Sequence, residues 1–143
     1  MILGIVFSVI AGMAMSIQGV MNTRLGEHIG TMEANAIVQC TAAALSLLVL
    51  LFYHPGSFGA LHDTPKIYWL GGIFGLVITV TVMLGIKHLS PTVSISAILI
   101  SQLLVAALID AFGLMESEKV PFGWGKFVGL GLMLGGVVLF KWK

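Results

Sequence analysis

Five long apolar runs constrain the fold of this chain more than any other feature of its sequence. A transmembrane helix needs about 20 consecutive apolar residues, and runs of that length lie at about 2–21, 32–53, 67–87, 91–113 and 123–141. Only helices and closed barrels satisfy their backbone hydrogen bonds in lipid, and continuous runs without strict alternation select helices. We therefore predict an all-α integral membrane protein with five transmembrane helices, in a single domain that spans residues 1–143.

Composition supports this assignment and excludes several classes of function. Charged residues make up 9% of the chain, against about 25% in soluble domains. The net charge is +1, and no basic stripe indicates a nucleic-acid partner. Cys40 is the single cysteine, and no two histidines share a helical face at metal-ligand spacing. We expect no metal, no cofactor, no nucleic-acid partner and, without a catalytic constellation, no enzymatic activity.

Polar side chains deep inside the apolar runs are the first candidates for a functional site. At about 1.5 Å rise per residue, Gln102 lies roughly 16 Å beyond Pro91, close to the bilayer centre. Ser101 precedes it, and Gln39 and Thr79 are central in their own runs. Such groups should face the bundle interior or a water-filled cavity rather than acyl chains.

A second polar pair, Gln18 and Asn22, lies four residues apart on one face of the 2–21 helix and its continuation. We predict that these residues bind a small solute, together with Ser101, Gln102, Gln39 and Thr79. The alternative is that they only join helices by hydrogen bonds, which are worth ~0.6 kcal/mol on average in membranes.

Two carboxylates are candidates for proton or cation coupling, because ionisable groups in spans are often functional. Glu33 follows the expected N-cap, Thr31, so a favourable interaction with the helix dipole is an alternative explanation for a carboxylate at this position. Asp110 lies near the end of the 91–113 run, where contact with water at the interface also explains it.

Glycine spacing gives the clearest packing signal. Small residues four apart let transmembrane helices approach closely. The 123–141 run holds such a cluster, at Gly125, Gly129, Gly131, Gly135 and Gly136. We predict that it forms a packing surface, either within the chain or across a dimer.

The distribution of basic residues does not select one orientation in the membrane. The N-terminal side carries Lys66, Lys119 and Lys126, and the opposite side carries Arg24, Lys87, Lys141 and Lys143. Because Lys/Arg asymmetry sets orientation, this balance favours dual topology, in which two copies pair as an inverted repeat. The alternative is one fixed orientation, either of the chain by itself or set by a partner.

Three stretches carry a resemblance to a known family. They are AGMAMSIQGVMNTRL (11–25), SAILISQLLVAALIDAFG (96–113) and the Val120–Pro121 pair before the last helix. Together they resemble the drug/metabolite transporter superfamily, in particular its short five-helix branch of bacterial inner-membrane exporters. The closing GLGLMLGGVVLF (129–140) is similar to the last helix of small multidrug resistance proteins.

The resemblance implies a multi-pass protein of the bacterial cytoplasmic membrane, built as an inverted dimer of two five-helix units, ten helices together. It also implies that the second unit is either a copy of this chain or a paralogous five-helix chain. One departure matters: small multidrug resistance proteins carry a glutamate in the middle of their first helix, where this chain reads SVIAGMAMSI (8–17). Proton exchange by that residue is therefore excluded.

We predict a small-solute transporter, an exporter by resemblance, that works by alternating access with its site near the bilayer midplane. With no central charge, the site suits a neutral polar, amphipathic or weakly cationic solute. The alternative is a non-transporting membrane subunit or scaffold that packs beside a partner membrane protein. Lipid surrounds the chain in either case.

Overall fold

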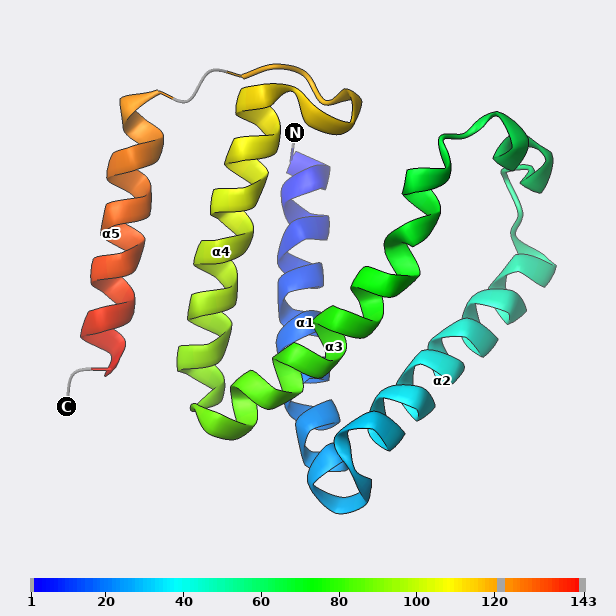
Figure 1. Ribbon diagram of the computed structural model, residues 1–143, viewed down its shortest axis with the longest axis horizontal. Helices are drawn as coiled ribbons and strands as arrows, with labels where there is room; N and C mark the ends of the chain where they lie inside the picture. The colour runs from blue at the N-terminus through cyan, green and yellow to red at the C-terminus, as the bar shows by residue number, and fades with distance from the viewer. Residues whose placement is uncertain (1, 121–122, 142–143) are drawn as a thin grey trace. The chain divides into compact units, whose positions relative to one another are not determined.

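The computed structural model describes residues 2–120 and 123–141, and every regular element in that part of the chain is helical. The main helices are α1 (Ile2–Ile29), α2 (Thr31–Phe52), α3 (Gly71–His88), α4 (Pro91–Phe112) and α5 (Trp124–Lys141) (Figure 1). Four helical segments are long and apolar enough to cross a membrane, and Trp124–Phe140 forms a shorter apolar helix. The prediction of an all-α integral membrane protein of about five helices is therefore confirmed.

The chain divides into two compact units, Met1–His88 and Leu89–Lys143. Unit 1 contains α1, α2 and α3, with the 3-10 turns η1 (Phe58–Asp63) and η2 (Lys66–Leu70) between α2 and α3. Unit 2 contains α4, the short turn η3 (Leu114–Glu116) and α5. The prediction that the whole chain is one transmembrane domain stays a prediction.

The first helix differs most from its predicted bounds, because α1 continues to Ile29 rather than ending near residue 21. The polar residues that follow the apolar run are compatible with a helix, and Arg24 and Glu27 form an ion pair one turn apart at 2.9 Å. A helix of 28 residues is about 42 Å long, whereas the hydrocarbon core measures about 30 Å. The fall in hydropathy therefore marks where the helix leaves the hydrocarbon, and the helix itself continues.

A single residue, Gly30, joins α1 to α2. Its φ of 104° lies in a region that L side chains rarely adopt, and its N–H donates to the Gly26 carbonyl at 3.0 Å. The predicted N-cap Thr31 is wrong: Thr31 is the first residue of α2 and the cap position is Gly30, which has no side chain to offer. Figure 1 shows the resulting sharp reversal of the chain.

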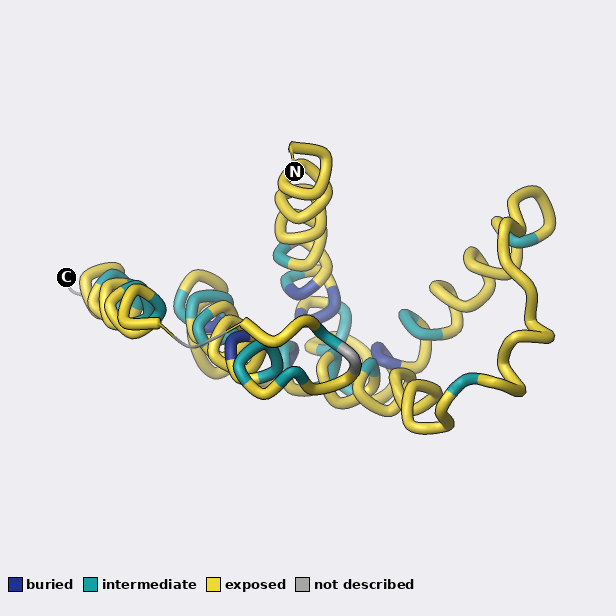
Figure 2. The backbone as a smooth tube through the Cα atoms, turned by 90° about the horizontal axis from the view of Figure 1, so that it is seen from above, coloured by how far each residue is buried: buried dark blue, intermediate teal, exposed yellow. Residues whose placement is uncertain are grey.

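The core of unit 1 lies toward this joined end. Its buried residues come from the later part of α1, the first turn of α2 and the end of α3: Gly19, Asn22, Thr23, Ala34, Asn35, Met83 and Ile86 (Figure 2). A Cβ added at Gly19 would lie 3.1 Å from Ile86 Cδ1 and 3.1 Å from Val82 Cγ1. The missing side chain at Gly19 is thus what allows α1 and α3 to meet.

The third apolar run forms two elements. Residues 67–70 belong to the 3-10 turn η2, and the α-helix begins at Gly71, four residues after the predicted start at 67. Before it, η1 is capped by Ser57, whose hydroxyl accepts from the Gly59 N–H at 3.2 Å. The remaining predicted starts and ends, at 32, 53, 87, 91, 113, 123 and 141, agree with the structure to within one residue.

Unit 2 is a pair of neighbouring helices, α4 and α5, that run in opposite directions (Figure 1). Ser90 caps α4 by accepting from the Val93 N–H at 3.4 Å, and Pro91 occupies the first turn, where its missing N–H costs nothing. The helix ends at Gly113, whose φ of 63° is left-handed. The loop then folds back, and the Val120 N–H donates to the Asp110 carbonyl at 2.9 Å.

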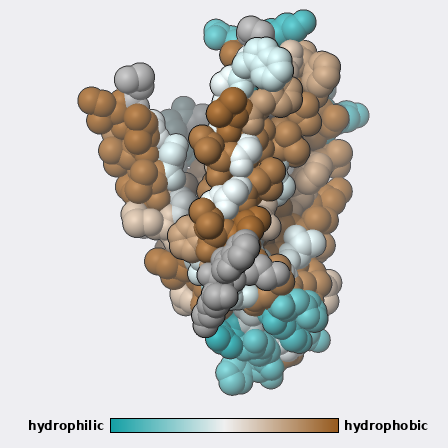
Figure 3. Space-filling model, turned by 90° about the vertical axis from the view of Figure 1, so that its left-hand side faces the viewer, coloured by the Kyte–Doolittle hydropathy of each residue, from teal (hydrophilic) through white to brown (hydrophobic). Residues whose placement is uncertain are grey.

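The surface of both units is what a lipid environment requires. Large apolar side chains are exposed along all five helices, among them Phe7, Leu47, Phe74, Leu104 and Leu132. Figure 3 shows this apolar surface in brown along the helices, with hydrophilic residues gathered toward their ends. Very few residues are buried within either unit, so contact with lipid or with other membrane helices must cover the rest.

A polar cavity in unit 1 as candidate functional site

A small cavity lies between α1 and α3, with a volume of about 40 Å³. Its polar lining comes from Gln18 and Asn22 of α1 and from Thr79 of α3. Met15, Gly19, Ile78 and Val82 supply the apolar remainder. The cavity thus combines three of the predicted solute-binding residues in an otherwise apolar contact.

Helical spacing explains why these residues share the cavity. Gln18 and Asn22 lie four apart, as do Met15 and Gly19, so both pairs lie on neighbouring strips of the same α1 face. Gly19 brings α3 close at this level, and the same glycine lines the cavity. The cavity therefore lies directly at the close approach of α1 and α3.

The second helix reaches the same region through Gln39. Its Nε2 donates to Thr79 Oγ1 at 3.4 Å, and the Thr79 hydroxyl donates to the Gly75 carbonyl at 2.8 Å. A Cβ at Gly75 would lie 3.6 Å from Gln39 Nε2, so the glycine leaves room for the amide. The structure thus brings together four of the six predicted residues, from three helices: Gln18, Asn22, Gln39 and Thr79.

Asn22 is the most enclosed of the four, with 7% of its surface exposed. Its side chain lines the cavity, and within residues 2–120 and 123–141 it makes no hydrogen bond. A water needs about 10–15 Å³ of such space and two to four polar partners, so the cavity has room for a few waters. No charged side chain lines it, and it therefore suits neutral hydrogen-bonding groups.

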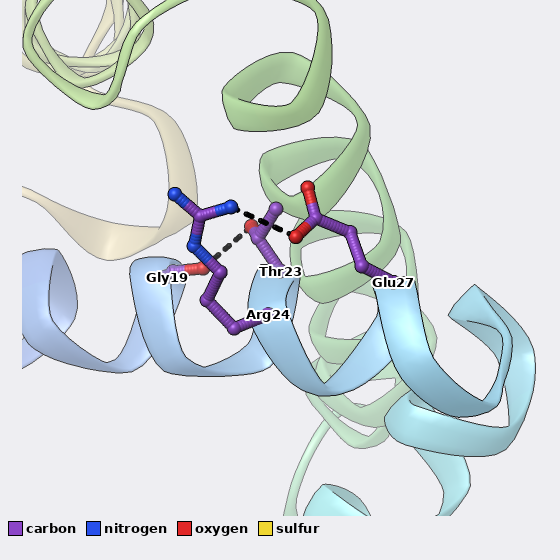
Figure 4. Close-up of polar contacts among 4 residues, drawn as sticks. All are labelled: Gly19, Thr23, Arg24 and Glu27. Carbon is purple, nitrogen blue, oxygen red and sulfur yellow. Dashed lines mark hydrogen bonds and ion pairs between the residues drawn. The ribbon is translucent and has the colours of Figure 1, made fainter.

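Two buried polar residues of unit 1 were not predicted from the sequence. Thr23 is 4% exposed, and its hydroxyl donates to the Gly19 carbonyl at 2.7 Å (Figure 4). Asn35 is 4% exposed, and its Oδ1 has no hydrogen-bond partner in the described part of the chain. The predicted end of the first helix near residue 21 hid Thr23, because it placed this residue outside the helix. Asn35 lies in the first turns of α2, where the sequence alone shows no sign of burial.

The ion pair between Arg24 and Glu27 lies next to Thr23 but faces outward (Figure 4). The Arg24 side chain is 70% exposed. An exposed pair of this kind contributes little to stability. Neither residue lines the cavity, so the cavity keeps its neutral lining although two charges follow on the same helix.

Ser101 and Gln102 belong to unit 2, where both are exposed on α4. The Ser101 hydroxyl donates to the carbonyls of Ala97 and Ile98, at 3.1 and 2.9 Å, within its own helix. The role of both residues as solute ligands stays a prediction.

Neither candidate carboxylate lines the cavity. Glu33 is exposed in the first turn of α2, and its carboxylate lies against Gly30. Asp110 is half-buried in unit 2, where it lines a groove between α4 and α5. Coupling through either residue stays a prediction.

The glycines of α5 are open. A Cβ added at any of Gly125, Gly129, Gly131, Gly135 and Gly136 would meet no described atom within 4 Å. Gly125, Gly131 and Gly135 are exposed, while Gly129 and Gly136 are half-buried. α4 therefore does not pack closely on this cluster, and its role in a dimer stays a prediction.

Comparison with known proteins gives one match. Residues 3–139 match the family model described as "Putative inner membrane exporter, YdcZ", a family of the drug/metabolite transporter type. No curated protein and no solved structure matches the chain. The match covers nearly the whole chain, and it describes transporters rather than enzymes. The apolar helices, the multi-pass arrangement and this match lead to one conclusion: the chain belongs to this family of inner-membrane exporters.

Proposed function

We propose that the chain exports a small neutral, amphipathic or weakly cationic solute by alternating access, as an antiparallel dimer. The observation that carries the proposal is the amide-lined cavity of Gln18, Asn22, Thr79 and the adjoining Gln39. Each amide can donate and accept hydrogen bonds, and the cavity carries no charge that would select an ion.

The largely enclosed amide of Asn22 supports a ligand-binding role. A polar group buried without a partner costs about 1–3 kcal/mol, and Asn22, only 7% exposed, lines the open space of the cavity. Water or a solute in the cavity therefore gains by hydrogen-bonding to this amide. A solute that replaces the water gains the same hydrogen bonds and the apolar contact with Ile78 and Val82.

The size of the cavity supports a dimeric site. A volume of about 40 Å³ holds water but not a metabolite. Gln18 is exposed and Gln39 half-buried, so both can contact a second copy. In this proposal an inverted partner completes the site, Ser101 and Gln102 extend its polar lining, and Glu33 or Asp110 carries any coupled proton or cation.

The experiment that tests the proposal is thermal unfolding of the purified chain in nanodiscs, with a panel of sugars, polyols, neutral amino acids and monoamines. A solute at about 100 times its Kd stabilises the state that binds it by about 2.7 kcal/mol. We expect at least one class of solute to raise Tm in wild type. A panel without any effect, for a chain that assembles normally, would favour the non-transporting subunit instead.

Two threonines on α3 provide a matched pair for this assay. Thr79 and Thr81 both donate to a carbonyl of their own helix, at 2.8 and 2.7 Å, but only Thr79 lines the cavity and accepts from Gln39. Thr79→Val is expected to raise the Kd for the solute about tenfold, which corresponds to the loss of one hydrogen bond, and so to reduce the stabilisation by the solute. Thr81→Val should retain the wild-type Kd, and an equal loss in both variants would place the solute elsewhere.

Substitutions at the glycines of α5 test whether the chain forms the proposed dimer. At about 100° per residue, Gly131 and Gly135 lie on a different face of α5 from Gly129, which lines the groove toward α4. Gly131→Leu is expected to raise the dissociation constant of the dimer about tenfold, since close helix approach depends on small residues. Energy transfer between labelled chains in vesicles measures this change. Gly72→Leu, at another open glycine, is the control and should leave the dimer intact.

A further inference from the structure

The segment that joins α2 to α3, residues 53–70, carries many exposed large apolar side chains for a connection between helices. Phe58 of η1 is 74% exposed, and Ile67, Trp69 and Leu70 of η2 are exposed as well. Figure 1 shows the segment linking the spread ends of α2 and α3. Exposed apolar side chains gathered in one connection indicate a surface that contacts another apolar phase.

The turn η1 is apolar on one side only. In a 3-10 helix, residues three apart lie one above the other, so Phe58 and Leu61 form one strip. The side chains of His62 and Asp63 belong to the other two strips, and they are 96% and 91% exposed. The turn is therefore amphipathic.

The apolar strip lines an open groove. Phe58 and Leu61 border it together with Leu50 from the last turn of α2, and its volume is about 530 Å³. His62 and Asp63 do not line it. With 22 residues, α2 is about 33 Å long, slightly more than the hydrocarbon core of about 30 Å. The groove therefore lies at the level where the acyl chains end and the headgroups begin.

The length of α3 determines the level of the other end of the segment. Its 18 residues measure about 27 Å, less than the hydrocarbon core of about 30 Å, so the apolar residues of η2 complete the span. Lys66 begins both η2 and the span, and Tyr68 and Trp69 follow within one turn. Tyrosine and tryptophan at the ends of transmembrane helices lie at the level of the headgroups. Both ends of the segment therefore reach the same membrane surface.

We propose that residues 53–70 form an anchor in the membrane interface, and that the partner of this surface is the phospholipid bilayer itself. Phe58 and Leu61 insert among the acyl chains, which fill the groove, while Asp63 faces the water. Amphipathic segments bury their apolar face about 5–10 Å into this boundary. The charges of the segment, Asp63 and Lys66, cancel. Apolar burial therefore drives the insertion, rather than attraction to anionic lipids.

Spin labels on single cysteines of the full chain test the proposal in phosphatidylcholine vesicles. Cys40→Ser removes the single native cysteine, and a label is then attached through Phe58→Cys, Leu61→Cys, His62→Cys or Asp63→Cys. Dissolved oxygen reports contact with acyl chains, and a water-soluble nickel chelate reports contact with water. We expect the labels of the apolar strip to collide mainly with oxygen, and those at positions 62 and 63 mainly with the chelate. Equal accessibility at the four positions would overturn the proposal.

A matched pair of variants separates insertion of this strip from a general effect of charge. In the chain labelled at position 61, Phe58→Asp is expected to shift the equilibrium about tenfold toward the water-exposed turn, since burial of one large apolar side chain contributes at least that factor. Ala60→Asp adds the same charge on the strip that carries Asp63 and should leave the label inserted. An equal effect of both substitutions would contradict an insertion through Phe58 and Leu61.

Two other results would assign the surface to a different partner. Labels of the apolar strip that neither oxygen nor the chelate reaches would indicate contact with a second copy or another protein, and would overturn the lipid assignment. Insertion only in vesicles that contain phosphatidylglycerol would indicate recognition of an anionic headgroup, and would also overturn it. Equal insertion with and without phosphatidylglycerol is the expected result.

Discussion

Replacing Gly19 with leucine is expected to separate α1 from α3 and to abolish transport. A Cβ at this position already lies 3.1 Å from Ile86 Cδ1 and from Val82 Cγ1, and the rest of a leucine side chain has no space. Overpacking of this kind costs about 1–3 kcal/mol, a large part of what unit 1 can gain from so small a core. Thermal unfolding in nanodiscs should show a lower Tm, and solute-dependent stabilisation should be lost.

Gly12→Leu is the matched control for this experiment, because Gly12 lies on the same helix and a Cβ there meets no described atom within 4 Å. It should leave the Tm of the chain close to that of wild type. Gly19→Ala should fall between the two, since its Cβ requires Ile86 Cδ1 and Val82 Cγ1 to move by only a few tenths of an ångström. If Gly19→Leu unfolds at the wild-type temperature, α1 and α3 do not pack closely at Gly19, and the prediction is contradicted.

Gly30→Ala is expected to destabilise the connection between α1 and α2. The backbone of Gly30, with φ 104° and ψ 145°, costs a residue with a Cβ about 1–3 kcal/mol, and the new Cβ would also collide with the Glu33 carboxylate. The two effects can be separated. Glu33→Ala in the same chain removes the collision and should restore part of the lost Tm, while the cost of the backbone conformation remains.

Gly56→Ala is the control for this second experiment. Gly56 lies in the loop after α2, and a Cβ there would meet no described atom within 4 Å. The substitution should have little effect on Tm. A wild-type Tm for Gly30→Ala would mean that α1 and α2 are joined by a different backbone conformation.

The fold class was predictable because the apolar runs are long and their interruptions are few. Each run became a helix, and the Ser90–Pro91 start of α4 followed from local capping rules. The end of α1 was not predictable in the same way. Hydropathy reports which solvent surrounds a residue, whereas the end of α1 depends on Gly30, a residue that can adopt a positive φ.

The residues of the candidate site were predictable in part. Depth along the runs selected Gln39 and Thr79, and helical spacing paired Gln18 with Asn22; the structure brings these four side chains together, while their role in binding a solute stays a prediction. The face of α3 that meets α1 depends on the contact of Gly19 with Val82 and Ile86, and these two residues lie far from Gly19 in the sequence. Helical periodicity within one run does not contain that information.

The uneven packing of unit 1 has a mechanical consequence. Its buried residues lie toward the Gly30 end, whereas residues 2–15 of α1 and 40–49 of α2 are all exposed, and Figure 1 shows these ends spread apart. A bundle fastened at one end can swing its free ends without breaking the contacts that hold it together. Gly30 and the Gly19 contact then form the pivot of such a motion, and the amide cavity lies beside the Gly19 contact. In the transport cycle that we propose, a small rotation there would change which side of the membrane a solute can reach.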